Sequence, residues 1–237
     1  MPPKSPAVPA TRTGTPPGKA AENSIYELLR DRIIAWRYPP GYHLGEQQLC
    51  EEFAVSRVPI REALRALTAD GFVVKKPNQG CFVKQLNVEE AKELFEVRVA
   101  LECHIVEQLA RRNPDRVWLE RERAIWRNLL ENPESGEVYA FVKMDNAFHL
   151  GLARALGNRR ILAALEEVTE RLGFMKLCVE ASEERLVETA AEHLAILDAI
   201  GRQDASAARE AIRRNIDHSS NRVEIAISRA LMAAHAM

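Results

Sequence analysis

Two histidines and an aspartate have the residue types and the spacing of a metal-binding set. Asp145 and His149 are four residues apart, so a helix through this segment projects both side chains from one face. His193 lies in a separate segment whose apolar residues recur at helical spacing. One carboxylate and two imidazoles that converge from separate helices are good ligands for a divalent transition metal. Mononuclear iron oxygenases use the same ligand types, so the spacing leaves open both a metal-dependent enzyme and a non-catalytic binding protein.

Each of these residues also has an interpretation without a metal. A histidine on a helix is commonly a surface residue or a hydrogen-bonded core residue. Asp145 has Lys143 and Arg154 as neighbours in the sequence, and either of them could pair with it. The metal-binding interpretation therefore depends on whether the fold brings the three side chains together.

The segments that must position these residues have the pattern of an all-helical domain. From Val88 onward, no strand pattern occurs for about 145 residues. Candidate N-caps are Asn113, Ser182 and Asp204. A bundle of six helices can enclose a cavity for a ligand. The expected helices cover residues 88–112, 113–132, 137–156, 159–180, 182–201 and 204–232.

Residues 44–83 have a different organisation, in which two short helices precede a pair of strands. Ser56 can cap the second helix, whose apolar residues recur at i, i+3, i+4 and i+7. Arg57, Arg61 and Arg65 are spaced by four and form a second stripe on that helix. Two short helices joined by a tight turn, with arginines at the start of the second, match a helix-turn-helix that binds the DNA major groove. The alternative is that the arginines only solvate an amphipathic helix.

A β-hairpin is expected directly after this second helix. Residues 72–76 and 81–84 have strand composition, and the turn-forming residues 77–80 separate them. Strand, turn and strand predict a hairpin "wing". A further helix is expected before the helix-turn-helix, from a cap at Asn23-Ser24 to the break at Pro39-Pro40.

These segments resemble a known family of regulators. VSRVPIREALRALTADGFV followed by KKPNQGCFV resembles the winged helix of the GntR superfamily of bacterial transcription regulators. LFEVRVALE, DNAFHLGLARALGN, EHLAILDAI and AAREAIRRN resemble the FCD ligand-binding domain of its FadR-like branch. The resemblance implies a mainly α fold, in which an N-terminal winged helix-turn-helix of three helices plus a β-hairpin wing precedes an all-α six-helix ligand-binding bundle. The expected domains are a disordered tail at 1–21, the DNA-binding domain at 22–86 and the effector-binding domain at 87–237.

The resemblance also implies which residues touch DNA. Arg57 and Arg61 would contact base edges or phosphates, and Ser56 would anchor a phosphate. The wing tip would approach the minor groove. A homodimer would then bind an inverted repeat in double-stranded DNA. The expected DNA-binding residues are Gln47, Ser56, Arg57, Arg61, Arg65, Asn78, Gln79 and Gly80.

In the effector domain, the resemblance implies a metal held by one aspartate and three histidines. Asp145, His149 and His193 match the first three positions, but Asn215 stands at the fourth. An amide oxygen is a weaker ligand for Zn²⁺ or Ni²⁺ than an imidazole, so this departure puts metal binding in question. His218, three residues further on, is an alternative fourth ligand.

Arg98 is a candidate ligand-binding residue, because the family pattern also has an arginine at this point. A guanidinium turned into a cavity would bind the carboxylate of a small organic acid in a forked geometry. The alternative is a salt bridge to Glu102, one helical turn further on.

Composition limits the remaining possibilities. The net charge is −1, and the four cysteines are scattered without a CxxC pair, as expected for reduced thiols in a cytosol. No apolar run is long enough to cross a membrane, and the N-terminus has no signal-peptide pattern. No P-loop, G-x-S-x-G or dinucleotide-binding motif occurs, so an enzyme is not expected. We predict a cytoplasmic DNA-binding repressor controlled by an organic acid, with a metal-dependent enzyme and a pure metal sensor as alternatives.

Overall fold

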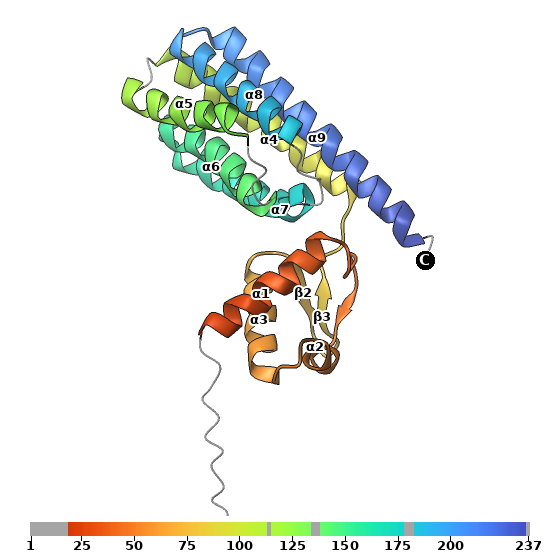
Figure 1. Cartoon of the computed structure of the whole chain (residues 1–237). Coiled ribbons are helices and arrows are strands. Elements are labelled where there is room, and N and C mark those ends of the chain that lie inside the picture. Colours follow the sequence, from red (N-terminus) through yellow and green to blue (C-terminus); the bar gives the residue numbers. More distant parts are fainter. Residues whose placement is uncertain (1–18, 113–114, 134–137, 178–182, 236–237) are drawn as a thin grey trace, which may run out of the picture.

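The computed structural model describes residues 19–112, 115–133, 138–177 and 183–235. Its N-terminal part is a winged helix, joined by a short connection to a helical bundle (Figure 1). The helices of the winged helix pack their apolar faces together and the small sheet lies beside them. Its elements are α1 (Lys19–Ile34), β1 (His43–Leu44), α2 (Glu46–Phe53), α3 (Arg57–Ala69), β2 (Val73–Lys76) and β3 (Gly80–Val83).

The turn between α2 and α3 has the geometry of a helix-turn-helix. Ala54 ends α2 in the left-handed region, at φ 53°, and its N–H donates to the carbonyl of Cys50. Ser56 is the N-cap of α3, as predicted, but its side chain makes no capping hydrogen bond. The apolar stripe predicted for α3 is buried, which leaves the arginine stripe on the outer face. The buried residues of α3 are Pro59, Ile60, Ala63, Leu64 and Leu67.

The wing is an antiparallel hairpin of β2 and β3 in which Lys76 pairs with Gly80. Asn78 and Gly80 adopt positive φ angles of 58° and 96°, the backbone conformation that asparagine and glycine tolerate in tight turns. The prediction of two strands was incomplete, because β1 pairs with β3 and extends the sheet to the order β1-β3-β2. A strand of two residues is too short to show an alternating pattern.

The first helix begins earlier than expected. α1 starts at Lys19, so Asn23 and Ser24 lie within the helix and do not cap it, and the predicted tail overlaps it by three residues. Residues 1–18 of that tail lie outside the described residues.

The C-terminal part contains the six predicted helices. Asn87 caps the first by accepting from the N–H groups of Glu89 and Glu90. Asp115 accepts from the N–H of Val117 at the start of the second, whereas the predicted caps Asn113 and Ser182 lie outside the described residues. The helices are α4 (Val88–Arg111), α5 (Arg116–Glu131), α6 (Val138–Leu156), α7 (Arg159–Leu177), α8 (Glu183–Gly201) and α9 (Ala205–His235).

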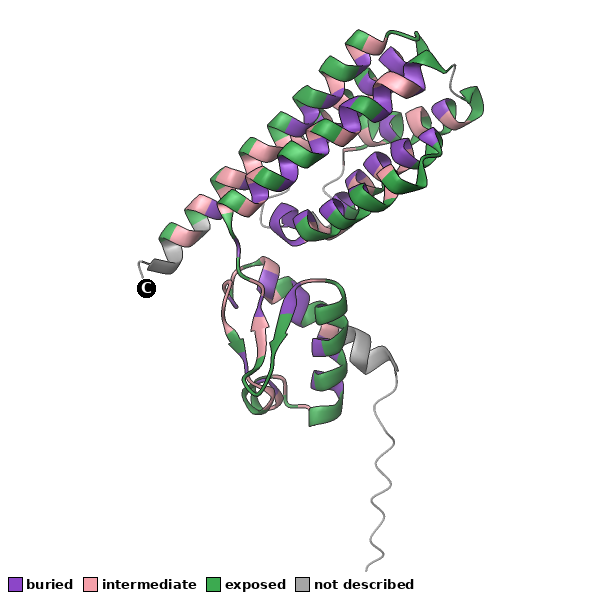
Figure 2. Cartoon of the chain, turned by 180° about the vertical axis from the view of Figure 1, so that it is seen from behind, coloured by how far each residue is buried: buried purple, intermediate pink, exposed green. Residues whose placement is uncertain are grey.

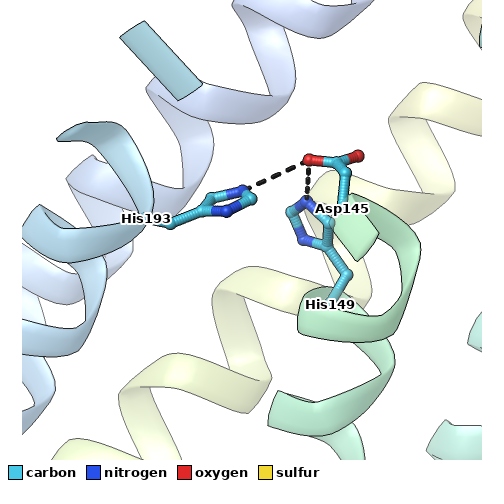
Figure 3. Close-up of side chains that lie close together, drawn as sticks. All are labelled: Asp145, His149 and His193. Carbon is cyan, nitrogen blue, oxygen red and sulfur yellow. Dashed lines mark ion pairs between the residues drawn. The ribbon is translucent and has the colours of Figure 1, made fainter. Parts of the chain in front are cut away.

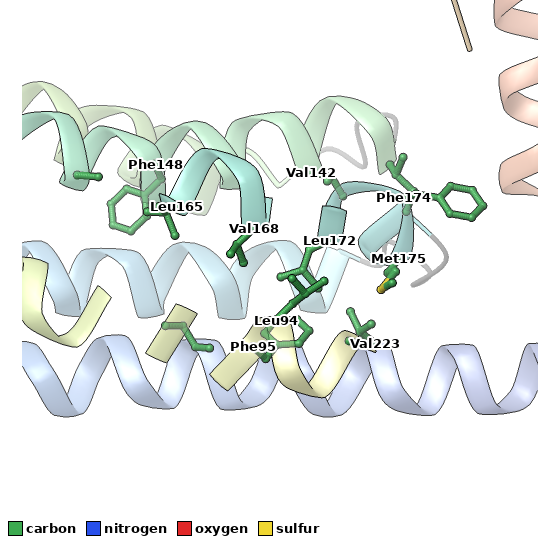
Figure 4. Close-up of a cluster of buried hydrophobic side chains, with 14 of the residues drawn as sticks. Leu94, Phe95, Val142, Phe148, Leu165, Val168, Leu172, Phe174, Met175 and Val223 are labelled. Carbon is green, nitrogen blue, oxygen red and sulfur yellow. The ribbon is translucent and has the colours of Figure 1, made fainter. Parts of the chain in front are cut away.

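The core of the bundle lies between α4, α9 and the helices that cover them. α4 and α9 run side by side along most of their length (Figure 1). Buried residues line their inner faces, and exposed residues their outer faces (Figure 2). Figure 4 shows Leu94 and Phe95 of α4, Leu172 of α7 and Val223 of α9 in one apolar cluster. None of the helices within the described ranges is long and apolar enough to span a membrane.

Aromatic side chains connect the winged helix to the bundle. Phe72, just before β2, has its ring centroid 5.8 Å from that of Phe174 on α7 and 6.1 Å from that of Tyr139 on α6. The guanidinium carbon of Arg30 on α1 lies 4.7 Å from the centroid of the Tyr139 ring. The two domains therefore touch through α6 and α7, the helices nearest to the winged helix.

Candidate metal centre and DNA-binding face

The structure brings Asp145, His149 and His193 together in the interior of the bundle (Figure 3). Asp145 and His149 lie one turn apart on α6, and His193 reaches them from α8. Oδ1 of Asp145 is 3.3 Å from Nε2 of His193 and 3.7 Å from Nε2 of His149. All three side chains are buried. The sequence prediction that these residues form one cluster is therefore confirmed.

The ring of His193 is held by aromatic packing rather than by hydrogen bonds. Phe148 stacks on it with centroids 3.9 Å apart, and Trp126 meets it edge-on at 4.1 Å. Neither ring nitrogen of His193 makes a hydrogen bond to any described residue, although Nε2 lies 3.3 Å from Oδ1 of Asp145. Burial lowers the pKa of His193 to about 4, and attraction to Asp145 offsets only part of this effect. The imidazole is therefore neutral near pH 7, the form that binds metals.

Glu102 orients the second imidazole of the cluster. This buried α4 carboxylate contacts Nδ1 of His149 through Oε2, while its Oε1 accepts a 2.7 Å hydrogen bond from Nε of Arg98. Burial alone would raise the pKa of Glu102, but the charges of Arg98 and His149 and their hydrogen bonds lower it to about 2. An ionised carboxylate at Nδ1 directs the other nitrogen, Nε2, toward Asp145. Metal-ligating histidines in proteins are commonly oriented by such a carboxylate.

From its spacing in the sequence, Glu102 is expected only as a partner of Arg98. That ion pair is present: Nε of Arg98 binds Glu102, as the salt-bridge interpretation predicted. Arg98 is buried, with 3% of its surface exposed, and lies on the same α4 face as Glu102. The role of Glu102 beside His149 could not be predicted, because the two residues are 47 positions apart on different helices.

Lys176 is the second residue that sequence reasoning missed. Its ammonium, buried near the end of α7, contacts Oδ2 of Asp145 and donates a 2.7 Å hydrogen bond to Oδ1 of Asn146. Burial alone would raise the pKa of Asp145, but the ammonium of Lys176 and the nearby imidazoles of His149 and His193 hold it well below its ordinary value. Asp145 is therefore an ionised carboxylate with one oxygen facing the histidines and the other facing Lys176.

The partners considered for Asp145 from the sequence lie elsewhere. Lys143 is exposed, and its ammonium lies 4.3 Å from the centroid of the Tyr139 ring. Arg154 is exposed and pairs with Glu166 on α7 at 3.5 Å. The interpretation of Asp145 as a partner of these neighbours is therefore wrong.

Asn215 and His218 both face Glu192 on α8. Nδ2 of Asn215, which is buried, donates to Glu192 at 2.7 Å. His218 contacts the other oxygen of Glu192, and 47% of its side chain is exposed. Asn215 is thus fixed by a neighbour of His193, and the half-exposed His218 is held at the surface rather than beside Asp145.

The side chains of Asp145, His149 and His193 are suited to bind a divalent metal. The ligand atoms of Asp145, His149 and His193 all lie within 4.8 Å of one another, and they combine one carboxylate with two imidazoles. The buried nitrogens of His193 make no hydrogen bond to the described residues, which is costly unless something else binds them. The set resembles the three-ligand sites in which a further position remains open to water or to a ligand.

A cavity of about 610 Å³ adjoins this cluster. Trp118 and Ile125 of α5 and Gly151 of α6 line it, together with Trp126 and Phe148, which also contact His193. Its volume lies within the range of small-molecule sites. Asp145, His149 and His193 do not line it themselves, so the three ligands are enclosed by packed side chains.

The residues predicted to bind DNA are all exposed on the winged helix. Arg57, Arg61 and Arg65 project from the outer face of α3, as the stripe predicted. Nε of Arg61 donates to Glu46 at 2.8 Å, and Arg65 pairs with Glu62 at 2.7 Å. A groove of about 540 Å³ runs between α3 and the wing. The remaining predicted residues, all exposed, are Gln47, Ser56, Asn78, Gln79 and Gly80.

Both parts of the chain match known families. Residues 21–83 match the gntR family of bacterial regulatory proteins, and residues 93–218 match the FCD domain. The Nta operon transcriptional regulator of Aminobacter aminovorans is 32% identical over 178 residues, which cover 74% of this chain and 82% of that protein. The gluconate operon transcriptional repressor of Bacillus licheniformis is 28% identical over 204 residues, which cover 83% of this chain and 82% of that protein.

A solved structure supports the same fold. The transcriptional regulator GntR from Rhodococcus sp. RHA1 superposes with a TM-score of 0.59 at 21% identity, covering 86% of this chain and 98% of that chain. Because the relatives are transcriptional regulators, the metal-dependent enzyme that the ligand spacing left open is not the function of this chain. The chain belongs to the GntR family of bacterial transcription regulators, with an N-terminal winged helix-turn-helix that binds DNA and a C-terminal FCD domain of the FadR-like type.

Proposed function

We propose that this regulator is a cytoplasmic repressor that binds its operator as a homodimer and responds to a small organic acid bound beside a divalent metal. The observation that carries this proposal is the buried set of Asp145, His149 and His193, in which the ring nitrogens of His193 make no hydrogen bond to the described residues. The repressor assignment is supported by a relative that is itself a repressor.

On the DNA side, the exposed face of α3 carries the recognition residues. Arg57 and Arg61 stand at its start, where a recognition helix enters the major groove and arginine reads guanine. The hydroxyl of Ser56 makes no cap bond and is free to bind a phosphate. Arg65 and Gln47 extend this contact, and Asn78, Gln79 and Gly80 approach the minor groove at the wing tip. Two copies related by a two-fold axis would bind two half-sites of an inverted repeat.

On the effector side, Asp145, His149 and His193 would hold Zn²⁺ or Ni²⁺, and Asn215 is a weak fourth candidate because Glu192 holds its amide. A metal bound there supplies positive charge and an open position for a carboxylate. Arg98 keeps the neighbouring carboxylate Glu102 ionised, and its remaining guanidinium nitrogens would bind the organic acid. The DNA domain would respond through the contacts of α6 and α7 with Phe72.

A pure metal sensor is the second candidate. Nε of Arg98 is bound by Glu102, and the ammonium of Lys176 is bound by Asp145 and Asn146. These two buried cations are thus engaged by protein groups, which favours the metal itself as the effector.

A DNA-binding experiment separates these functions. An operator selected from random DNA by the purified protein is titrated with chelator-treated protein, with Zn²⁺- or Ni²⁺-loaded protein, and with loaded protein plus a panel of organic acids. Release that needs both metal and acid supports the main proposal, and release by metal alone supports the sensor. Equal operator affinity under all these conditions for the wild-type protein and for His193→Ala would refute both.

A further inference from the structure

The ammonium of Lys176 forms an ion pair with Asp145, the carboxylate of the candidate metal-binding set. We propose that Lys176 is a built-in competitor of the metal: it holds Asp145 when the set carries no metal ion, and it must leave that carboxylate when an ion binds. This inference rests on the proposed metal site and adds the residue that tunes its affinity. Asp145 is the carboxylate among the three ligands, so competition for it affects the whole set.

The competition follows from burial and charge. Only 2% of the Lys176 side chain is exposed, so its charge is poorly screened by solvent. Lys176 contacts Oδ2 of Asp145, and the two histidines face Oδ1 of the same group. A divalent cation bound to Oδ1 would therefore lie within a few ångströms of a buried ammonium. Repulsion between like charges at such a distance in the protein interior opposes the binding of one or the other.

The ammonium of Lys176 has a second acceptor that it could keep after leaving Asp145. Lys176 already donates to Oδ1 of Asn146, which is on the same helix as Asp145 and is less buried. Retaining this hydrogen bond while giving up Asp145 would leave the ammonium partly satisfied. The position of Lys176 also links the site to the DNA domain, because Phe174, two residues earlier on α7, contacts Phe72.

The test measures the affinity of the full, chelator-treated chain for Zn²⁺ and for Ni²⁺ by titration calorimetry. Lys176→Met removes the competing charge and should bind the metal at least about tenfold more tightly than the wild-type protein. Lys143→Met is the matched control, because Lys143 is exposed and lies two residues from Asp145 on the same helix. It removes one positive charge near the site without freeing the carboxylate, and its metal affinity should stay within about twofold of wild type.

Thermal unfolding gives a second measurement. Without metal, Lys176→Met removes the ammonium that balances the charge of the buried Asp145 carboxylate and should lower the melting temperature. Addition of Zn²⁺ should then raise the melting temperature more in this variant than in the wild-type protein, since tighter binding to the native state stabilises it more. Lys176→Gln keeps a hydrogen-bond donor without the charge, and it replaces the methionine variant if that variant does not fold.

The outcomes separate this inference from the proposed function. If His193→Ala abolishes metal binding but Lys176→Met and Lys176→Gln bind no more tightly than wild type, the competition is refuted and the metal site stands. If wild type binds no metal and the Lys176 variants do, Lys176 excludes the ion and the inference is supported. If no variant binds metal, both the inference and the metal-dependent function are refuted.

Discussion

The ring of Phe174 meets that of Phe72 edge-on, with the planes at 73°, so the last turn of α7 touches the winged helix directly. An aromatic pair of this kind contributes about 0.5–1.5 kcal/mol beyond its buried area. We expect Phe174→Leu to keep the metal affinity and to reduce the change in operator affinity that the effector causes. Fluorescence anisotropy with labelled operator, with and without effector, measures this change.

Phe141→Leu serves as the control for this variant. Phe141 is also buried, but its ring faces the guanidinium of Arg185 within the bundle. An undiminished response in Phe174→Leu would show that the signal reaches the DNA domain by another route.

Arg57→Ala and Arg61→Ala should each weaken operator binding by about 1–3 kcal/mol, because each removes a contact to a base edge or a phosphate. For Arg61, the substitution also frees Glu46, whose carboxylate then faces the DNA without a counter-charge. Arg112→Ala, an exposed change at the end of α4, is the control and should leave binding unchanged. Operator titrations at two salt concentrations make the comparison, and wild-type affinity in both α3 variants would remove the assignment of α3 as the recognition helix.

Glu102→Gln should weaken both folding and metal binding. The buried guanidinium of Arg98 would lose its ionic partner, and breaking such a pair costs about 3–5 kcal/mol. The carboxylate that orients His149 would also be lost, which typically lowers metal affinity by about 10- to 100-fold. Urea unfolding of the chelator-treated protein and metal titration measure the two effects.

A double variant separates the two roles of Glu102. Arg98→Met combined with Glu102→Gln buries no unpaired charge, so much of the lost stability should return while metal affinity stays low. Recovery of metal affinity together with stability would contradict the orienting role of Glu102.

The buried His193 should make stability depend on pH in a defined window. Its folded-state pKa of about 4 lies below the ordinary value of 6.5, so between these values the unfolded chain binds the proton more readily. The free energy of unfolding of chelator-treated protein should therefore fall as the pH decreases from 6.5 to 4. In His193→Gln this part of the slope should be absent, and urea unfolding at pH 7, 6, 5 and 4 tests it. Parallel curves for the two proteins would rule out His193 as the cause.

Glu102 adds a second window at lower pH. Its folded-state pKa of about 2 lies below the ordinary 4.5, so its stabilising effect is present above pH 4.5 and is lost as the pH falls toward 2. The two windows overlap only between about pH 4 and 4.5, so a titration series extended below pH 4 distinguishes the histidine from the carboxylate.

The elements with a local signal could be predicted from the sequence. The apolar stripe of α3 and the arginines beside it follow helical periodicity, and Asp145 and His149 share a face because they are four residues apart. β1 could not be predicted, because its two residues become a strand only through pairing with β3.

The contacts that Lys176 and Glu102 make with the candidate metal ligands could not be predicted from nearby residues in the sequence. Lys176 meets Asp145 from 31 positions away, and Glu102 meets His149 from 47 positions away. A lysine near the end of an amphipathic helix is ordinarily an exposed residue, so its burial is decided by how α7 packs against α6. For Arg98, the sequence left a ligand and a salt bridge as equal alternatives, and the ion pair with Glu102 is a contact that i, i+4 spacing allows.

The imidazole of His193 is clamped between two rings, Phe148 on its face and Trp126 at its edge. A side chain fixed in this way has already lost its rotational freedom during folding, so an incoming ion need not order it. Such preorganisation makes the site selective, because an ion must suit donor directions set in advance by aromatic neighbours that never touch it.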